Sequence, residues 1–183
     1  MSNLKVLSRE EVNLPTQQVF DKLKRKIGLV PNLYAAVANS PQALNSMLSL
    51  GDNLTGGEYS GKEVEAIALA VGQANSCSYC LSAHTEIAKM NGLTEAETIQ
   101  IRTGDIDDPR LSALVRLATS LVITRGKPSQ TLIGKFFNAG YNEAALAELI
   151  GHVALNTFTN YINHVADTPI DFPLAAELQQ ELN

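Results

Sequence analysis

The amino-acid sequence predicts an all-α protein, a bundle of helices joined by short turns. Apolar residues recur at helical spacing, successive segments begin at residues that commonly cap helices, and no segment alternates apolar and polar residues as a half-buried strand does. With 183 residues, 45% of them hydrophobic and 18% charged, the chain is long enough to bury a core. Helices that follow one another without strands pack as a bundle.

Prolines and capping residues mark where the first helices begin. Proline is favoured in the first turn of a helix because its missing N–H is not needed there and its φ is already helical. Pro15, Pro31 and the Ser40-Pro41 pair, an N-cap followed by a proline, therefore each predict a helix. These three predicted helices cover residues 15–28, 31–39 and 41 to about 55, where two glycines follow.

Two further helices surround the cysteines of the chain. Residues 60–63, Ser-Gly-Lys-Glu, form a capping box, in which the serine and glutamate side chains bind backbone N–H groups at the helix start. The following segment, 63–74, is apolar nearly all round, which predicts a central, buried helix. Asn75 and Ser76 are both good N-caps and predict that the next helix covers residues 77–90.

The second half of the chain repeats the pattern of caps and apolar stripes. A second capping box opens at Thr94, and Asp108-Pro109 precedes an apolar stripe that runs from Leu111 to Val122. Asn142 is the expected cap of the last long helix. The predicted elements are helices over residues 94–103, 109–122, 129–138 and 143–164, then an irregular tail with a weak final turn over 175–182.

Composition limits the classes of function. The net charge of -5 argues against binding to nucleic acid or to anionic membranes. There is no run of eighteen apolar residues and no signal-peptide pattern at the N-terminus, so we expect a cytoplasmic protein. We expect one domain over residues 1–183, with an N-terminal helical arm (1–40), a core (41–165) and a C-terminal tail (166–183). The light charge load favours contacts between copies of the chain.

The most informative local feature is the pair Cys77 and Cys80, the only cysteines in the chain. A disulfide across three positions closes too small a loop to stabilise a fold much, so the pair predicts redox or metal chemistry. Cys77 is expected in the first turn of its helix, where unpaired N–H groups lower the pKa of a thiol below its usual ~8.5. His84 follows Cys80 by four residues on the same helix face, where it can act as its general base.

Glu65 lies within the apolar helix that precedes the cysteines, where a carboxylate has to be paired or functional. His84 is the partner that would satisfy it and hold the imidazole in one tautomer, whereas Glu63 is explained by the capping box. Two alternatives stay open at this point. The cysteines are an inert buried pair, or Cys77, Cys80 and His84 bind zinc, although a second ligand pair is missing.

Several polar residues of the last long helix have no partner that the sequence identifies. They are His152, Asn156, Asn160 and His164. Buried polar side chains in bundles are commonly hydrogen-bonded. We therefore interpret these four as residues that pack helices together.

The pattern Glu65-x11-Cys77-Ser-Tyr-Cys80-x3-His84, in the setting EAIALAVGQANSCSYCLSAH, resembles the alkylhydroperoxidase D-like (AhpD-like) members of the carboxymuconolactone decarboxylase superfamily. The ending NYINHVADTPIDFP is similar to their peroxidase-related branch. The resemblance implies an AhpD-like helical bundle with the CxxC motif at the start of a central helix. It also implies a homo-oligomer, whether dimer, trimer or hexamer.

For the mechanism, the resemblance implies an antioxidant, thiol-dependent peroxidase that uses neither cofactor nor metal. Cys80 is then the peroxidatic thiol, activated by His84 with Glu65 in a proton relay through water. Its attack on a hydroperoxide leaves a sulfenic acid, which condenses with Cys77 to a redox-active disulfide. A dithiol reductant, such as a lipoyl- or thioredoxin-like protein, restores the pair.

The sequence departs from the best-known peroxidases of this family at Tyr79, where they have a histidine between the cysteines. A phenol is not basic near neutral pH, but it can hydrogen-bond to substrate or relay, so we count Tyr79 as a supporting residue. Two other functions remain open. One is a carboxymuconolactone decarboxylase-type lyase, which the presence of a dithiol disfavours. The other is a non-enzymatic thiol redox sensor.

Overall fold

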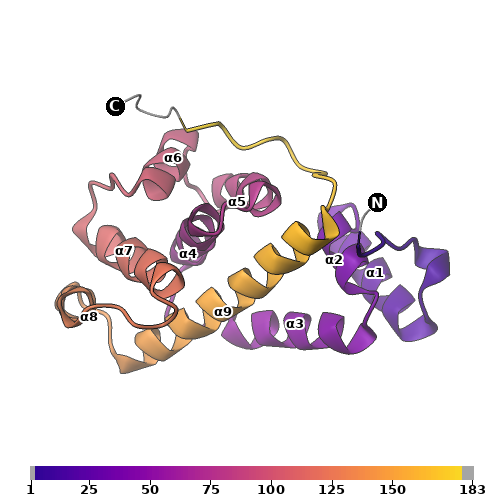
Figure 1. Ribbon diagram of the computed structural model, residues 1–183, viewed down its shortest axis with the longest axis horizontal. Coiled ribbons are helices and arrows are strands. Elements are labelled where there is room, and N and C mark those ends of the chain that lie inside the picture. The colour runs from indigo at the N-terminus through magenta and orange to yellow at the C-terminus, as the bar shows by residue number, and fades with distance from the viewer. Residues whose placement is uncertain (1–2, 179–183) are drawn as a thin grey trace.

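The structure, a computed structural model, describes residues 3–178, and all regular elements within that range are helical (Figure 1). This confirms the predicted all-α class. In chain order the elements are η1 (Arg9–Glu11), α1 (Leu14–Ile27), α2 (Asn32–Val37), α3 (Pro41–Leu54), α4 (Gly61–Ala74), α5 (Ser78–Met90), α6 (Glu95–Thr103), α7 (Pro109–Ile123), α8 (Gln130–Asn138) and α9 (Glu143–Ala166). Of these elements only the 3₁₀ turn η1 was not predicted from the sequence, because three residues are too few to show a period.

Both predicted capping boxes are present. At the start of α4 the N–H of Ser60 donates to Glu63 Oε2 at 2.9 Å, and the N–H of Glu63 donates to Ser60 Oγ at 3.3 Å. At the start of α6 Thr94 and Glu97 make the same reciprocal pair at 2.6 and 3.2 Å. These bonds satisfy N–H groups that the end of a helix otherwise leaves without partners.

The cysteine helix begins one residue later than predicted. Cys77, rather than Asn75 or Ser76, is the N-cap of α5. The N–H of Cys77 donates to the carbonyl of Gly72 at 2.9 Å, and Ser76 takes a left-handed conformation with φ 56°. Because the backbone of Cys77 is used to close α4, the next helix starts only at Ser78.

Other predicted boundaries differ by one or two residues. Helix α2 ends at Val37 rather than near Asn39, and α9 continues to Ala166 instead of ending near His164. The predicted final turn over 175–182 was wrong for residues 175–178, which are irregular, and the rest of it lies outside the described residues.

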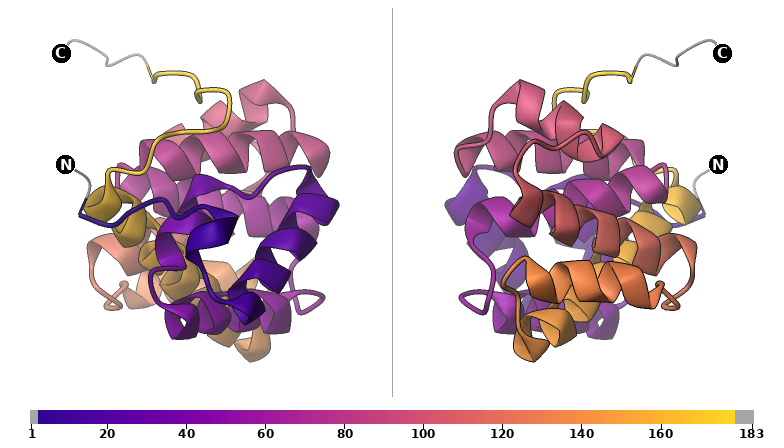
Figure 2. Two further views of the ribbon diagram at one scale, coloured as in Figure 1. Left: turned by 90° about the vertical axis from the view of Figure 1, so that its right-hand side faces the viewer. Right: turned by 90° about the vertical axis from the view of Figure 1, so that its left-hand side faces the viewer.

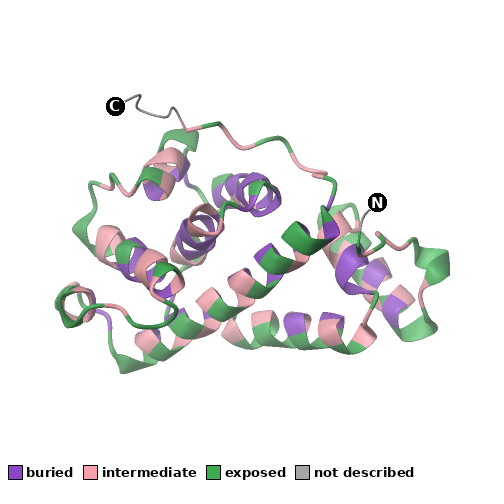
Figure 3. Ribbon diagram, in the orientation of Figure 1, coloured by how far each residue is buried: buried purple, intermediate pink, exposed green. Residues whose placement is uncertain are grey.

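Helix α4 forms the centre of the molecule and packs against α5, α6, α7 and α9 (Figure 1). Figure 2 shows the two ends, one built from η1 to α3 and the other from α7 and α8. Buried positions follow α4 and the inner face of α5 (Figure 3), as predicted for a central helix. Of the helices between residues 3 and 178, none is both long and apolar enough to cross a lipid bilayer.

After α9 the chain returns across the cysteine helix as an irregular segment, residues 167–176, which we call the C-terminal strap (yellow in Figure 1). Asp171 Oδ2 accepts a hydrogen bond from the N–H of Asn32, at the start of α2, at 2.8 Å. The N–H of Ala175 donates to Ser82 Oγ on α5 at 3.2 Å. The strap therefore joins α2 and α5.

The packing of side chains around α4 contributes measurably to the free energy of unfolding. Leu69 is fully buried in the core cluster that surrounds α4. We expect Leu69→Ala to lower the free energy of unfolding by about 2–5 kcal/mol, because it removes buried apolar atoms and leaves a cavity. Met90→Ala, at a position 84% exposed at the end of α5, is the control and should change it by less than about 0.5 kcal/mol. Equal denaturant midpoints for the two variants would contradict this packing.

Candidate active site

Cys77 and Cys80 lie in the interior, where the chain passes from α4 to α5. Both are free thiols, with 0% and 3% of their surface exposed. The two Sγ atoms are 2.6 Å apart, so the thiol of one can hydrogen-bond to the sulfur of the other. The N–H of Cys80 also donates to Cys77 Sγ at 3.4 Å, because Cys77 caps the helix. The CxxC turn thus brings both sulfurs together without any other element.

The surroundings separate the acidities of the two thiols. The hydrogen bond from the Cys80 thiol lowers the pKa of Cys77 below its ordinary value, although burial opposes this, and the N–H of Cys80 adds to the lowering. The same hydrogen bond to Cys77, together with burial, raises the pKa of Cys80. The pair therefore favours one shared negative charge centred on Cys77, with the remaining proton on Cys80.

An amide of α9 completes the polar contacts of the sulfurs. Asn163 Nδ2 lies 3.2 Å from Cys80 Sγ and 4.0 Å from Cys77 Sγ. Asn160 lies beside it, where its Oδ1 accepts a hydrogen bond from Asn75 at 2.8 Å. Within the described chain the Nδ2 of Asn160 and the Oδ1 of Asn163 are buried and have no hydrogen-bond partner.

Asn163 is a site residue that the sequence analysis did not single out. One signal was available, because His152, Asn156 and Asn163 recur on a single face of α9, as side chains do when they follow the helical period. The interpretation of His152 and Asn156 as packing residues is too simple, because both line the cavity described below.

Glu65 on α4 and His84 on α5 face each other, as expected from the sequence. His84 Nδ1 and Glu65 Oε2 are 2.8 Å apart, and their side chains are 24% and 9% exposed. Burial by itself lowers the pKa of His84, but the charge and hydrogen bond of Glu65 outweigh it and raise that pKa above its ordinary value. The pair therefore favours an imidazolium held next to a carboxylate.

The hydroxyl of Tyr79 is engaged with α2 rather than with His84. It accepts a hydrogen bond from the N–H of Leu33 at 3.2 Å, and the ring meets Phe172 of the C-terminal strap edge-on, with centroids 5.8 Å apart. Burial raises the pKa of Tyr79, which keeps the phenol neutral. Tyr79 thus connects α5 to α2 and to the strap.

A cavity of about 810 Å³ lies beside the motif, against α3, α4, α5 and α9. Its described lining includes Cys80, Glu65 and His84 but not Cys77. Much of the remaining lining is apolar, with Leu33, Met47, Leu48, Leu54, Val64 and Leu155. Cys80 is therefore the sulfur that a molecule in the cavity can reach.

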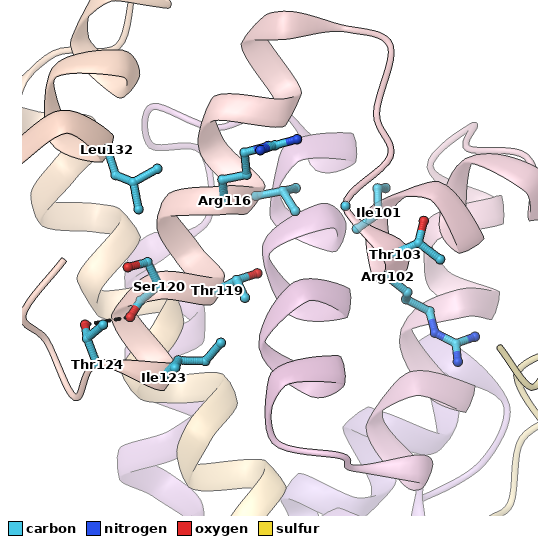
Figure 4. A pocket seen from close by; sticks show the side chains of 11 residues that line it. Ile101, Arg102, Thr103, Arg116, Thr119, Ser120, Ile123, Thr124 and Leu132 are labelled. Atoms are coloured by element: carbon cyan, nitrogen blue, oxygen red, sulfur yellow. Dashed lines mark hydrogen bonds between the residues drawn. The ribbon is translucent and has the colours of Figure 1, made fainter. Parts of the chain in front are cut away.

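A second cavity, of about 480 Å³, lies between α6, α7 and α8 and is lined by threonines, a serine, two arginines and apolar residues (Figure 4). Its described lining contains no cysteine, histidine or carboxylate. One of its arginines, Arg102, is held by Gln73 at 3.0 Å and by the carbonyl of Ala176 in the strap at 2.7 Å. The reactive groups thus belong to the first cavity. Within residues 3–178 no three His, Cys, Asp or Glu side chains are arranged to hold a metal ion.

Comparison with known proteins agrees with this architecture. A sequence model described as the carboxymuconolactone decarboxylase family matches residues 41–120, which include Glu65, both cysteines and His84. The alkylhydroperoxidase AhpD core of an uncharacterized peroxidase-related protein from Ralstonia eutropha JMP134 has a similar structure, with a TM-score of 0.84 and 20% sequence identity over 93% of this chain and 92% of that chain.

Two other solved structures share the fold. An uncharacterized peroxidase-related protein from Silicibacter sp. TM1040 matches with a TM-score of 0.78 and 21% identity, over 91% of this chain and 89% of that chain. A variant of the debrominase Bmp8 in complex with 2,3,4-tribromopyrrole matches with a TM-score of 0.80 and 18% identity, over 93% and 92%. No curated protein matches the chain significantly in sequence. The helices that carry the motif thus match the model of the carboxymuconolactone decarboxylase family, and nearly the whole chain has the fold of the alkylhydroperoxidase AhpD core and of the peroxidase-related proteins.

Proposed function

We propose that the protein is a thiol-dependent peroxidase that reduces organic hydroperoxides through a dithiol/disulfide cycle of Cys77 and Cys80. The observation that carries this proposal is a free thiol pair with its sulfurs 2.6 Å apart, of which one thiol lines a largely apolar cavity. The Glu65–His84 pair lines the same cavity and supplies a proton donor. Similarity to peroxidase-related proteins supports the same reaction.

The acidity of the thiols favours Cys77 as the nucleophile, whereas their position relative to the cavity favours Cys80. Transfer of the shared proton from one sulfur to the other accounts for both observations. Cys77 is the more acidic thiol, but it is fully buried and absent from the described cavity lining. Cys80 lines the cavity, and its thiol is the donor that stabilises a charge on Cys77. When that proton moves across to Cys77, the charge moves to the sulfur that faces the substrate. Cys77 thus serves as the immediate base for Cys80.

The first step oxidises Cys80. Its sulfur attacks the terminal oxygen of the hydroperoxide, the S–O bond forms, and the O–O bond breaks. The leaving alkoxide takes a proton from the imidazolium of His84 and departs as an alcohol, while Glu65 holds the ring in place. Cys80 is left as a sulfenic acid that carries the terminal oxygen and its hydrogen.

The second step forms the disulfide. The sulfur of Cys77 attacks the sulfur of the Cys80 sulfenic acid, and the hydroxyl group leaves as water with the proton of Cys77. Two electrons have then passed from the two thiols to the peroxide. A dithiol reductant, which we propose to be a lipoyl- or thioredoxin-like protein, restores both thiols by exchange. The reducing cytoplasm is the compartment that suits this cycle.

Removal of the second cysteine should stop the cycle halfway. In Cys77→Ser, one equivalent of hydroperoxide is expected to leave a sulfenic acid on Cys80, because no thiol is present to condense with it, and the oxidation should be slower than in the wild type because the immediate base of Cys80 is also lost. A dimedone-type probe and mass spectrometry of the labelled peptide measure this. Labelling of Cys77 in the Cys80→Ser variant, with none on Cys80 in Cys77→Ser, would reverse the assignment of roles.

The experiment that tests the function itself is hydroperoxide consumption by the purified protein with excess dithiol. Sustained turnover supports the peroxidase, whereas a single oxidation that then stops supports the redox sensor. Consumption of a lactone acid without peroxide turnover would support the lyase. If neither substrate is consumed, brominated pyrroles are the next class to assay, because the debrominase Bmp8 has the same fold.

We also propose that the protein forms a homo-oligomer through the outer face of α9. That face exposes large apolar side chains at Ile150, Phe158, Tyr161 and Val165. Apolar side chains grouped on one surface are typical of contacts between subunits.

A further inference from the structure

The cavity beside the cysteines extends well beyond the groups that the peroxidase cycle uses. On α9 the described lining runs from His152 to Thr159, seven positions that at about 1.5 Å per residue cover about 10 Å along the helix axis. Asn163, one turn beyond Thr159 on the same helix, is not part of that lining but contacts Cys80 Sγ, which is. The cavity is therefore elongated, with the thiol near one end and His152 toward the other.

His152 is a buried polar side chain with an unused hydrogen-bonding atom. It is 5% exposed, and its Nε2 has no hydrogen-bond partner among the described residues. Its ring stands edge-on to Tyr59, with centroids 5.8 Å apart. Its neighbour Asn156 donates its amide N–H to the backbone carbonyl of His152 at 2.9 Å and so does not satisfy the ring. A buried polar atom without a partner is unfavourable unless a ligand or water binds it.

The charges around His152 indicate the kind of group that fits. Burial lowers the pKa of His152 despite the opposing charges of Glu148 and Glu65, so the ring is neutral near neutral pH. The described cavity lining also contains the acidic residues Glu65 and Asp52, of which Glu65 is paired with His84, and its single lysine or arginine, Lys26, is exposed. A neutral imidazole offers no charge to a carboxylate or phosphate, whereas it can hydrogen-bond to a hydroxyl or carbonyl group.

We propose that His152 anchors a distal subsite, and that the preferred substrate is an elongated, largely apolar hydroperoxide with a neutral hydroxyl or carbonyl group far from the peroxide. This proposal rests on the peroxidase function proposed above. The hydroperoxide lies at Cys80, the hydrocarbon chain contacts the apolar walls, and the distal oxygen bonds to Nε2 of His152. The distal group is not changed by the reaction, since only the O–O bond breaks.

The test compares two alkyl hydroperoxides of equal chain length, one of which carries a terminal hydroxyl, with hydrogen peroxide as a third substrate. The wild-type protein should show a higher kcat/KM for the hydroxylated substrate. His152→Leu should lose at least about tenfold of kcat/KM for that substrate, because its distal oxygen then has no partner, and little for hydrogen peroxide. His152→Gln, which keeps a hydrogen-bonding group, should recover part of the preference.

Equal losses on all three substrates would show a structural role for His152 and overturn the subsite, as would a wild-type protein that does not distinguish the two alkyl hydroperoxides. Binding of the corresponding diol and mono-alcohol, measured by thermal shift, tests whether the subsite recognises the distal hydroxyl group and does not require turnover. If the protein consumes no hydroperoxide but binds the diol more tightly than the mono-alcohol, and His152→Leu removes this preference, then the peroxidase function is refuted and the subsite is retained. Absence of that preference would overturn the subsite itself.

Discussion

Replacement of Cys80 by serine is expected to reduce hydroperoxide turnover to the uncatalysed background. Cys80 is the sulfur that faces the cavity, and a serine hydroxyl has neither the acidity nor the nucleophilicity of a thiol. The fold should persist, because serine is close in size and its oxygen can accept the hydrogen bond that Asn163 now donates to Cys80 Sγ. Initial rates of peroxide loss with excess dithiol measure the effect, and the denaturant midpoint checks that the variant is folded.

Ser78→Ala is the matched control for this variant. Ser78 lies between the two cysteines on the exposed side of α5, so its hydroxyl is not part of the cavity lining. We expect wild-type turnover from it. If Cys80→Ser kept its turnover, the assignment of Cys80 as the nucleophile would be wrong.

Replacement of Glu65 by glutamine is expected to lower kcat/KM by about 10²-fold, the usual size of a proton-transfer contribution. Glutamine keeps the size of the side chain but removes the charge that raises the pKa of His84. In the wild type the imidazolium is present below that raised pKa and is lost as the pH increases through it. The decline of activity on the alkaline side should therefore move to lower pH in Glu65→Gln.

The acidic side of the same profile of activity against pH reports the ionisation of the thiol pair. Activity should rise with pH through the lowered pKa of the thiol pair, because the charge that moves from Cys77 to Cys80 has to be present. That limb should be similar in the wild type and in Glu65→Gln. Measurement of kcat/KM against pH separates the two groups.

Two further variants test whether Glu65 and His84 act as one unit. At a pH above the lowered pKa that His84 has in Glu65→Gln, His84→Gln should cost about as much as that variant, and the double variant should be little worse than either, because both changes act on the same proton donor. Glu63→Gln, two positions away on α4, removes a carboxylate that serves the capping box and should leave the pH profile unchanged. Fully additive losses in the double variant would contradict the shared role.

The sequence predicted those features that depend on neighbouring residues. Caps and apolar stripes are local, so the helices were found nearly to the residue, and a carboxylate in an apolar helix called for a partner such as His84. Asn163 could not be identified in this way, because a polar residue on a long helix serves packing or a site according to how α9 crosses α5. For the order of thiol acidities the sequence held opposing indications, because the helix start favours Cys77 and His84 favours Cys80, and the contact between the sulfurs decides for Cys77.

The C-terminal strap has a consequence for how the protein is made. Ile170 and Phe172 pack against the cysteine cluster, and the bond from Asn32 to Asp171 joins residues 139 positions apart in the chain. During synthesis the motif leaves the ribosome about ninety residues before the strap does, as the separation of 93 between Ser82 and Ala175 shows. Until residues 167–176 have been synthesised, the nascent chain carries its reactive thiols without the strap that packs against them.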